Sequence, residues 1–578
     1  MTIAPAQLLQ QARDFAAEDP DVGSCAELLA AVADATNGDE AALAELQDRF
    51  AGHLEFGTAG LRGRIGAGTN RMNRVVVMRA AWGLGRYLIA DAEAHGVDAA
   101  RGVVIGFDGR RFSRQFAEDS AAVLCGMGIP VRMFDDVQPT PVVAFAIRHL
   151  GAAAGIVVTA SHNPPQDNGF KVFWARGSQI VPPQDTGIAA RIKEAPPVAE
   201  MTRPSPFFAA RSGLRRAPGD DVLDAYLQGV RGASLHPEVL RENPICVVHT
   251  AMHGVGHHLL VRALRQAGLR GLCSVPSQTE PDGAFPTVAF PNPEEPGAMD
   301  LALALAADVG ANLILANDPD ADRLAVGVPT PDGSYRMLSG NEVGWLLGTD
   351  AILHSDTGIG EDGQPREKLA VTTIVSSPLL GRIAADLGAS YTATLTGFKW
   401  LAHAGFAAEA RGGRFVVGYE EALGYSVGDL VRDKDGVSAA VRFVELCAWL
   451  RVQGRTISEE LDRIALRHGV AVGDQWSARM EGASGKARIN TLMAKWRDKP
   501  PTALAGVAVV SVEDLLTSTA WAADGNAPDV TLPKSNVLTF HDAEGTRLVV
   551  RPSGTEPKIK FYLDAIGQAA NAADLPAA

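Results

Sequence analysis

The chain has 578 residues, too many for one hydrophobic core, so we expect about three to five domains. Its formal net charge of −14 argues against a nucleic-acid-binding protein, and no charge-free apolar run approaches the roughly 18 residues of a membrane-spanning helix. Five scattered cysteines without metal-type spacing, and an N-terminus without a signal-peptide pattern, predict a cytoplasmic protein with reduced thiols.

The N-terminal stretch, residues 3–50, has the pattern of short amphipathic helices. Leu8, Ala12 and Phe15 recur at the spacing of one helix face. We interpret residues 1–50 as a helical extension that packs on the rest of the protein and carries no chemistry.

After this extension, apolar strands and helices alternate. Residues 102–107 and 129–134 are predicted strands with a helix between them, and residues 72–95 are a predicted helix with one apolar face: Val77, Ala81, Leu84 and Leu88. This alternation predicts a mainly parallel sheet with helices on both faces. Residues 193–220 contain five prolines and break the pattern, so we expect a linker or boundary there.

Three more units follow. The second has predicted strands at 245–249, 272–275 and 313–316. The third begins near Ser339, contains a polar loop at 355–367 and ends after a helix at about 437–452. The expected boundaries are therefore 1–50, 51–220, 221–335, 336–454 and 455–578.

A serine lies on a turn after one predicted strand. The apolar run Gly155-Ile-Val-Val is followed by Thr-Ala-Ser-His-Asn-Pro at residues 159–164. Pro164 lacks an amide donor and biases Asn163 away from helix, so the strand ends and Ser161 stays accessible on a fixed turn. Such a hexapeptide alone is more typical of a solvated turn.

Three aspartates follow another predicted strand, in Asn317-Asp-Pro-Asp-Ala-Asp-Arg. In an extended chain, Asp318, Asp320 and Asp322 would lie on one face. At about 5 Å apart they would repel by roughly 3 kcal/mol per pair at an effective dielectric of 20, a cost that a divalent cation removes. Carboxylate oxygens suit Mg²⁺, whereas the Gly and Glu of a calcium EF-hand loop and the Thr of D-x-D-x-T are missing. Arg323 adds a phosphate donor.

Two further segments are suited to anions. In Arg551-Pro-Ser-Gly-Thr-Glu-Pro-Lys-Ile-Lys, a turn would present backbone amides and two hydroxyls to one point, with Lys558 and Lys560 following at strand spacing. Phe56-Gly-Thr-Ala-Gly-Leu-Arg-Gly-Arg is rich in glycine, and its Arg62 could reach a phosphate. Each segment alone is also compatible with an ordinary polar loop.

These motifs, in this order, resemble the α-D-phosphohexomutase superfamily from about residue 50 to residue 565. Further matches are Gly106-Phe-Asp-Gly-Arg-Arg, Pro139-Thr-Pro, Asn168-Gly-Phe-Lys, Thr396-Gly-Phe-Lys-Trp, Gly418-Tyr-Glu-Glu-Ala-Leu-Gly, Met252-His-Gly-Val-Gly and Pro281-Asp-Gly-Ala-Phe-Pro. The last three look most like the phosphoglucomutase-2-type branch. The resemblance implies an α/β fold with three similar mixed α/β sandwich domains and a smaller α+β C-terminal domain around a central cleft.

The resemblance also assigns roles to residues. It implies that Ser161 carries a phosphoryl group, that Lys171, Arg62 and His162 assist catalysis, and that Ser161 and the three aspartates hold Mg²⁺. A lysine beside Arg and Mg²⁺ could have its pKa lowered into a useful range, which would suit Lys171 to acid–base catalysis. The implied substrate-binding residues are Thr58, Arg62, Arg323, Thr396, Gly397, Glu420, Lys434, Arg551, Ser553, Gly554, Thr555 and Lys560.

The implied reaction interconverts glucose 1-phosphate and glucose 6-phosphate through a bound bisphosphate, with a sugar bisphosphate as activator. One departure bears on the sugar: Ala422 stands where the family usually has a serine. Phosphopentomutase, phosphomannomutase and sugar-bisphosphate synthase activities stay open, as does a non-catalytic binding protein. We expect a phosphosugar as the partner, no nucleic acid or membrane, and a monomer or homodimer.

Overall fold

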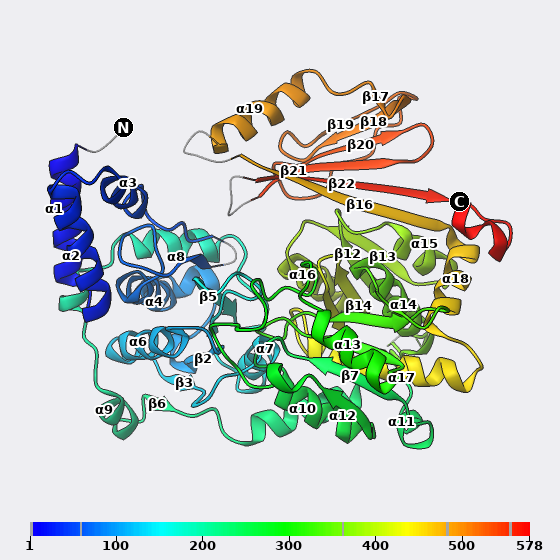
Figure 1. The fold of residues 1–578 in the computed structure, drawn as a ribbon, viewed down its shortest axis with the longest axis horizontal. Helices are drawn as coiled ribbons and strands as arrows, with labels where there is room; N and C mark the ends of the chain where they lie inside the picture. Colours follow the sequence, from blue (N-terminus) through cyan, green and yellow to red (C-terminus); the bar gives the residue numbers. More distant parts are fainter. Residues whose placement is uncertain (1–3, 58–59, 361–362, 481–484, 554–557, 578) are drawn as a thin grey trace. The chain divides into compact units, whose positions relative to one another are not determined.

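The computed structural model describes residues 4–577 except 58–59, 361–362, 481–484 and 554–557 (Figure 1). The chain divides into two compact units. Unit 1 comprises Met1–Met337 and Asp429–Glu445, and unit 2 comprises Leu338–Gly428 and Leu446–Ala578. Every helix of the described residues is too short or too polar to cross a bilayer.

The helices predicted for the N-terminal stretch are confirmed. They are α1 (Pro5–Glu18), α2 (Val22–Thr36) and α3 (Glu40–Arg49). The side chains of Asp21 and Asp39 accept hydrogen bonds from the first-turn amides of α2 and α3, which caps these helices. Leu8, Ala12 and Phe15 are buried in the same core as the first sheet.

The first sheet has the strand order β1-β5-β4-β2-β3-β6. Its strands are β1 (Leu61–Arg64), β2 (Val103–Phe107), β3 (Val131–Met133), β4 (Ala154–Val158), β5 (Asp167–Trp174) and β6 (Arg215–Arg216). The two predicted strands are confirmed as β2 and β3, and the predicted helix 72–95 forms α4 (Arg74–Ala90) and α5 (Ala92–His95). The parallel pairs are β2–β3, β2–β4 and β3–β6, whereas β5 runs antiparallel to β1 and β4.

Helices cover both faces of this sheet. One face of β2, with Val103, Ile105 and Phe107, packs into the core that contains α4 and α6 (Ser113–Gly126). On the other face, Gly106 and Gly155 leave room for α7 (Thr140–His149). A Cβ at Gly106 would lie 2.3 Å from Val143 of α7. Helix α8 (Gln184–Ile192) packs on α4.

The proline-rich segment 193–220 is more than a linker. It contains η2 (Val198–Glu200), α9 (Pro206–Arg211) and β6, and β6 pairs in parallel with β3. The segment therefore belongs to the domain of the first sheet, to which it adds the edge strand β6.

The second sheet of unit 1 has the order β11-β10-β9-β7-β8. Its strands are β7 (Cys246–Thr250), β8 (Gly271–Ser274), β9 (Leu313–Ala316), β10 (Ala325–Pro329) and β11 (Tyr335–Met337), which confirms the three predicted strands. The helices of this region are α10 (Asp221–Gly232), α11 (Val239–Glu242), α12 (His257–Ala267), α13 (Asp300–Val309) and the 3₁₀ turn η3 (Pro276–Gln278).

Unit 2 contains the third and fourth sheets. The third has the order β13-β12-β14-β15, formed by β12 (Lys368–Thr373), β13 (Ser390–Thr394), β14 (Arg414–Glu420) and β15 (Gly424–Val427). Its helices are α14 (Gly340–His354), α15 (Leu379–Asp386) and α16 (Phe398–Ala410). The predicted helix 437–452 is α17 (Gly436–Val452), whose residues up to Glu445 belong to unit 1, and α18 (Ile457–His468) follows it.

The fourth sheet differs from the others because all its pairs are antiparallel. Its order is β16-β22-β21-β20-β18-β17, and β19 also pairs with β18. The strands are β16 (Val470–Arg479), β17 (Ala503–Leu504), β18 (Val507–Asp514), β19 (Thr519–Ala522), β20 (Leu538–Asp542), β21 (Arg547–Pro552) and β22 (Lys558–Gly567). Helix α19 (Gly485–Asp498) packs on one face, and η4 (Ala572–Ala577) follows β22.

The first three sheets share one topology, which the residue letters did not reveal. In each, the first strand pairs in parallel with the second and the third, and the fourth strand is antiparallel to the third. The shared orders are β3-β2-β4-β5, β8-β7-β9-β10 and β13-β12-β14-β15. The expectation of three similar α/β domains and a different fourth is therefore confirmed.

Candidate active site

Three predicted functional loops occupy the same connection of the three similar sheets. The Ser161 loop joins β4 to β5, the aspartate loop joins β9 to β10, and the loop after Glu420 joins β14 to β15. Each loop thus leaves the carboxyl end of a central strand, where α/β sheets place ligand-binding residues. The Arg551 segment ends β21 and leads towards β22 of the fourth sheet.

Ser161 is buried and held in an unusual backbone conformation. Its φ is +52°, in the left-handed region that non-glycine residues adopt reluctantly. Its amide donates to Thr159 Oγ1 at 2.8 Å. Its hydroxyl donates to Asp318 Oδ2 at 2.7 Å and lies 3.3 Å from His162 Nδ1. The structure therefore brings the predicted nucleophile directly to the predicted metal loop.

The three aspartates converge, but not as an extended strand. Ala321 has a φ of +57°, and its amide donates to the carbonyl of Asp318, so the chain turns between the first and last aspartate. One oxygen from each carboxylate nevertheless lies within 4.8 Å of the others, and all three residues are fully buried. The predicted convergence is correct, and the predicted extended geometry is wrong because the turn at Ala321 interrupts it.

Two lysines and a threonine hold the outer oxygens of the aspartates. Lys171 Nζ donates to Asp320 Oδ2 at 2.8 Å and to Asp322 Oδ2 at 3.1 Å. Lys434 Nζ lies 3.1 Å from Asp322 Oδ2. Thr140 Oγ1 donates to Asp320 Oδ2 at 2.6 Å. In this geometry Lys434, expected at a substrate phosphate, contacts a metal-loop carboxylate.

The carboxylates fit a hard divalent cation. Asp320 Oδ1 and Asp322 Oδ1 are buried and have no hydrogen-bond partner among the described residues. A buried carboxylate oxygen without a partner is costly, and a bound cation removes that cost. The lysines and Thr140 hold the Oδ2 atoms, which orients the Oδ1 atoms as outer-shell partners orient metal ligands. The triad could therefore bind a metal.

Burial and neighbouring charges shift the pKa values in opposite directions. Burial raises the pKa of Asp318 well above its ordinary value, and the charges of Asp320 and Asp322 add to this effect. Burial alone would also raise the pKa of Asp320, but the Lys171 ammonium, with hydrogen bonds from its neighbours, holds it below its usual range.

Among the protein's own groups, the pKa of Lys171 is raised, whereas a lowered pKa was expected beside Arg and Mg²⁺. Burial alone would lower it, but the charges of Asp320 and Asp322 raise the pKa of Lys171 above its ordinary value. The lysine is therefore a cation at neutral pH. Burial and the nearby Arg323 and Arg62 lower the pKa of His162 well below its ordinary value, so its imidazole is neutral.

Arg62 and Arg323 lie in the same unit. Arg62, on β1, donates from Nη1 to Asn163 Oδ1 at 3.2 Å, and the pairing of β1 with β5 places it opposite Gly169. The Arg323 amide donates to Asp318 Oδ1 at 3.0 Å, and its Nε lies 3.9 Å from Asp322 Oδ1. The Arg62 guanidinium therefore contacts the serine loop, and the Arg323 guanidinium lies beside the aspartate loop. The predicted contact Thr58 lies outside the described residues.

Unit 2 assembles a second group of predicted residues. The Gly397 amide donates to Glu420 Oε1 at 2.7 Å, and the φ of Gly397, +111°, favours glycine there. Arg551 Nη1 donates to Thr396 Oγ1 at 2.5 Å. The predicted sugar-binding and phosphate-binding loops therefore meet within this unit.

Four other predicted residues belong to the Arg551 segment: Ser553, Gly554, Thr555 and Lys560. Ser553 donates its amide to the carbonyl of Lys558, and Lys560 pairs with Arg551 across β21 and β22. Gly554 and Thr555 lie outside the described residues. The expectation that the loops of all four domains form one site stays a prediction.

Two residues beside Ser161 and the aspartates were not predicted. Thr140 is fully buried on Asp320, and Arg110 donates to the carbonyl of Ser161. Both lie in motifs that support the family resemblance, Gly106–Arg111 and Pro139–Pro141. Those motifs were the available signal, but residue type alone did not indicate their contacts.

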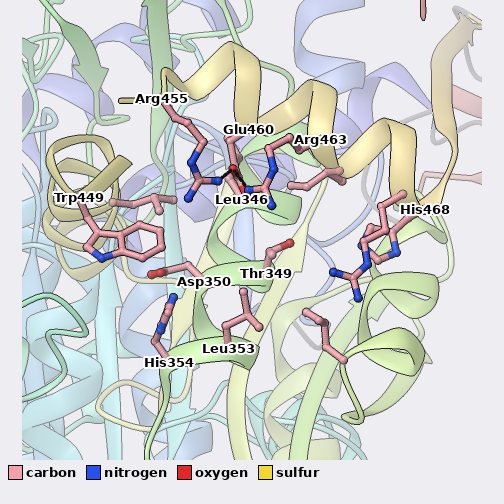
Figure 2. Close-up of a pocket in the computed structure, with 14 residues that line it drawn as sticks. Leu346, Thr349, Asp350, Leu353, His354, Trp449, Arg455, Glu460, Arg463 and His468 are labelled. Atoms are coloured by element: carbon pink, nitrogen blue, oxygen red, sulfur yellow. Dashed lines mark hydrogen bonds and ion pairs between the residues drawn. The ribbon is translucent and has the colours of Figure 1, made fainter. Parts of the chain in front are cut away.

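A cavity of about 210 Å³ in unit 2 is separate from these residues (Figure 2). It lies between α14, α17 and α18, and no predicted site residue lines it. Arg455 and Arg463 both form ion pairs with Glu460 at its edge. Its lining arginines are thus already paired with carboxylates, and we assign no role to the cavity.

Comparison with known proteins identifies related chains. Four models match in order: Phosphoglucomutase/phosphomannomutase, alpha/beta/alpha domain I at residues 53–198, domain II at 224–332, domain III at 340–466 and the C-terminal domain at 490–578. A probable phosphomannomutase of Haemophilus influenzae is 41% identical over 512 residues, which cover 87% of this chain and 95% of the relative. The phosphopentomutase of Homo sapiens is 37% identical over 542 residues, which cover 90% and 86%.

A solved structure supports the fold. The crystal structure of a phosphoglucomutase/phosphomannomutase family protein from Burkholderia thailandensis matches with a TM-score of 0.62 and 22% identity. The match covers 89% of this chain and 94% of that one. At this identity the likeness shows the fold alone.

Proposed function

The chain belongs to the phosphoglucomutase/phosphomannomutase family of phosphosugar mutases, and on that premise we propose that it interconverts glucose 1-phosphate and glucose 6-phosphate. The observation that carries this proposal is the hydrogen bond of 2.7 Å from Ser161 Oγ to Asp318, where three buried carboxylates converge. A hydroxyl placed at a cation site is suited to carry a phosphoryl group.

Ser161 would act as donor and acceptor of the phosphoryl group. In the first transfer, the P–O bond to Ser161 Oγ breaks and a bond forms to the free 6-hydroxyl of glucose 1-phosphate. The bound bisphosphate then reorients, and its 1-phosphoryl group returns to Ser161 Oγ. The product is glucose 6-phosphate, and the enzyme is again phosphorylated. Small amounts of a sugar bisphosphate would load the serine and activate the enzyme.

Side chains of unit 1 would transfer the protons of the reaction and bind the negatively charged phosphoryl group. Lys171 is a cation at neutral pH, so we assign it as the donor of the proton that Ser161 Oγ needs when the P–O bond breaks. The proton that leaves the attacking 6-hydroxyl then restores the charge of Lys171, so the transfer balances. The neutral His162, 3.3 Å from Ser161 Oγ, orients the hydroxyl, and Arg62 contacts the phosphoryl oxygens.

We assign Mg²⁺ to Asp318, Asp320, Asp322 and an oxygen on Ser161. When bound, this cation neutralises the negative charge that develops on the transferred group. The orphaned Oδ1 atoms of Asp320 and Asp322 support this assignment.

Unit 2 would bind the rest of the substrate. Glu420, fixed by the Gly397 amide, is suited to accept sugar hydroxyls, and Arg551 and Lys560 are suited to the non-transferred phosphate. Arg323, Lys434, Thr58, Thr396, Ser553, Gly554 and Thr555 complete the proposed substrate contacts. We further propose a cytoplasmic monomer or homodimer.

A pentose phosphate is the second candidate substrate. Ala422 removes one hydroxyl donor from the sugar loop, and the relative from Homo sapiens that is 37% identical is a phosphopentomutase. A site with one fewer polar contact discriminates less strongly between sugars.

The deciding assay is turnover of the 1-phosphates of glucose, mannose, ribose and deoxyribose, with Mg²⁺ and a trace of the matching bisphosphate. Fastest turnover of glucose 1-phosphate supports the proposal, and fastest turnover of a pentose 1-phosphate replaces it with phosphopentomutase activity. Net release of bisphosphate from a separate donor would instead indicate a sugar-bisphosphate synthase. No turnover, with no phosphate on Ser161, would indicate a binding protein.

A further inference from the structure

Arg110 holds the Ser161 loop through its backbone. Its Nη2 donates to the carbonyl oxygens of Ser161 and Asn163, each at 2.5 Å. Its Nη1 donates to those of Pro164 and Asp167 at 2.9 and 3.2 Å. One guanidinium therefore contacts four carbonyls of a single loop, and its planar fork fixes their relative positions.

The loop requires such support. Ser161 has a positive φ, and a non-glycine residue keeps that conformation only where its surroundings enforce it. The amides of Ser161, Asn163 and Asp167 all bond within the loop or its preceding strand end. Those bonds hold the backbone amides of the turn in place, whereas Arg110 holds the backbone carbonyls.

Arg110 is itself held from two sides. Asp108 accepts from the Arg110 amide at 3.0 Å and from Ser113 Oγ at 2.6 Å, and its second oxygen lies 3.4 Å from Arg110 Nε. Phe285 lies against the guanidinium, whose central carbon is 5.0 Å from the ring centroid. Arg110 is only 4% exposed.

The segment Pro281–Pro286 supplies this second side. A Cβ at Gly283 would lie 2.8 Å from Arg110 Cα, so glycine permits the close approach that brings Phe285 to the guanidinium. The Pro281-Asp-Gly-Ala-Phe-Pro motif, for which the sequence suggested no role, therefore packs against Arg110, the residue that supports the serine loop.

We propose that Arg110 is a positioning residue for phosphoryl transfer and that Pro281–Pro286 clamps it. Arg110 fixes Ser161 Oγ beside Asp318 by holding the loop carbonyls, without needing to touch the substrate. This inference rests on the proposed function. A lysine at position 110 would keep the charge but lose the planar fork, so the loop would lose its fixed spacing.

The test compares Arg110→Lys with Arg111→Lys, a matched control whose side chain is exposed and outside the loop contacts. Because small misplacements of a reacting group cost about 100-fold in rate, we expect Arg110→Lys to lower kcat by about 30- to 300-fold with KM changed less than about 3-fold. We also expect faster amide hydrogen exchange in residues 159–167 of this variant. Arg111→Lys should match the wild type in both measurements.

A folded Arg110→Lys enzyme with kcat within about 3-fold of wild type, or with unchanged exchange in 159–167, overturns the inference. If the variant does not fold, Phe285→Leu takes its place: a drop in kcat of about 3- to 10-fold with faster loop exchange supports the inference, and unchanged values overturn it. If the wild-type enzyme turns over none of the tested sugar phosphates, the proposed function is refuted instead. The hydrogen-exchange measurement alone then decides whether Arg110 holds the loop.

Discussion

Lys171 offers a direct test of how the aspartate cluster is stabilised without metal. Its ammonium donates to Asp320 and Asp322, and all three side chains are almost fully buried. Lys171→Met keeps a chain of similar length and removes the charge. The variant leaves three buried carboxylates, with Lys434, Arg323, Arg62 and Arg110 among the remaining nearby cations.

The expected cost follows from the geometry. Carboxylate oxygens within 4.8 Å of one another repel by about 3.5 kcal/mol per pair at an effective dielectric of 20. Removing one partner of a buried ion pair typically costs about 3–5 kcal/mol. We therefore expect Lys171→Met to lower the free energy of unfolding by about 3–5 kcal/mol in EDTA. Mg²⁺ should restore more stability to the variant than to the wild type, because it replaces the lost positive charge.

Urea denaturation with EDTA and with saturating Mg²⁺ measures both effects, and Lys193→Met, at an exposed lysine, is the control. Equal unfolding free energies of Lys171→Met and wild type in EDTA would refute the reasoning. A smaller Mg²⁺-dependent gain in the variant than in the wild type would do so as well.

Three other predictions concern the nucleophile, the metal ligands and a buried histidine. Ser161→Ala should lose turnover by at least about 1,000-fold while its circular dichroism spectrum stays that of the wild type; near-normal turnover would contradict the mechanism. Thr140→Val should weaken Mg²⁺ binding by about 10- to 100-fold in isothermal titration calorimetry, because Asp320 loses an orienting hydrogen bond of 2.6 Å; a dissociation constant within about 3-fold of wild type would contradict this. Burial lowers the pKa of His249 to about 3, below its unfolded value of about 6.5, so the unfolded state binds more protons between these values and stability falls as pH falls. Between pH 6.5 and 5, His249→Gln should therefore lose about 1.6 kcal/mol less stability than wild type in urea titrations, and an identical pH dependence would exclude this role.

The loop motifs could be predicted because their signals are local. An apolar run followed by Ser-His-Asn-Pro indicates a strand that ends in a turn, and Ser161 does follow β4. The aspartate spacing also predicted convergence, although the left-handed Ala321 replaced the assumed extended chain with a turn.

Long-range contacts could not be predicted in the same way. Lys434 contacts Asp322, although it lies more than a hundred positions later in the sequence. Nothing in the local sequence Arg432-Asp-Lys-Asp-Gly specifies that contact. The raised pKa of Lys171 depends on two carboxylates from another sheet. The common placement of three loops between the third and fourth strands depends on strand order, which composition and periodicity do not encode.

The central claim is that Ser161 carries the transferred phosphoryl group. The most direct measurement is incubation with glucose 1,6-bisphosphate labelled with ³²P, followed by peptide mapping and a chase with unlabelled glucose 1-phosphate. We predict about one label per chain on Ser161, and its transfer during the chase into the glucose phosphate pool. Label on another residue, or turnover without any label on Ser161, would contradict the account.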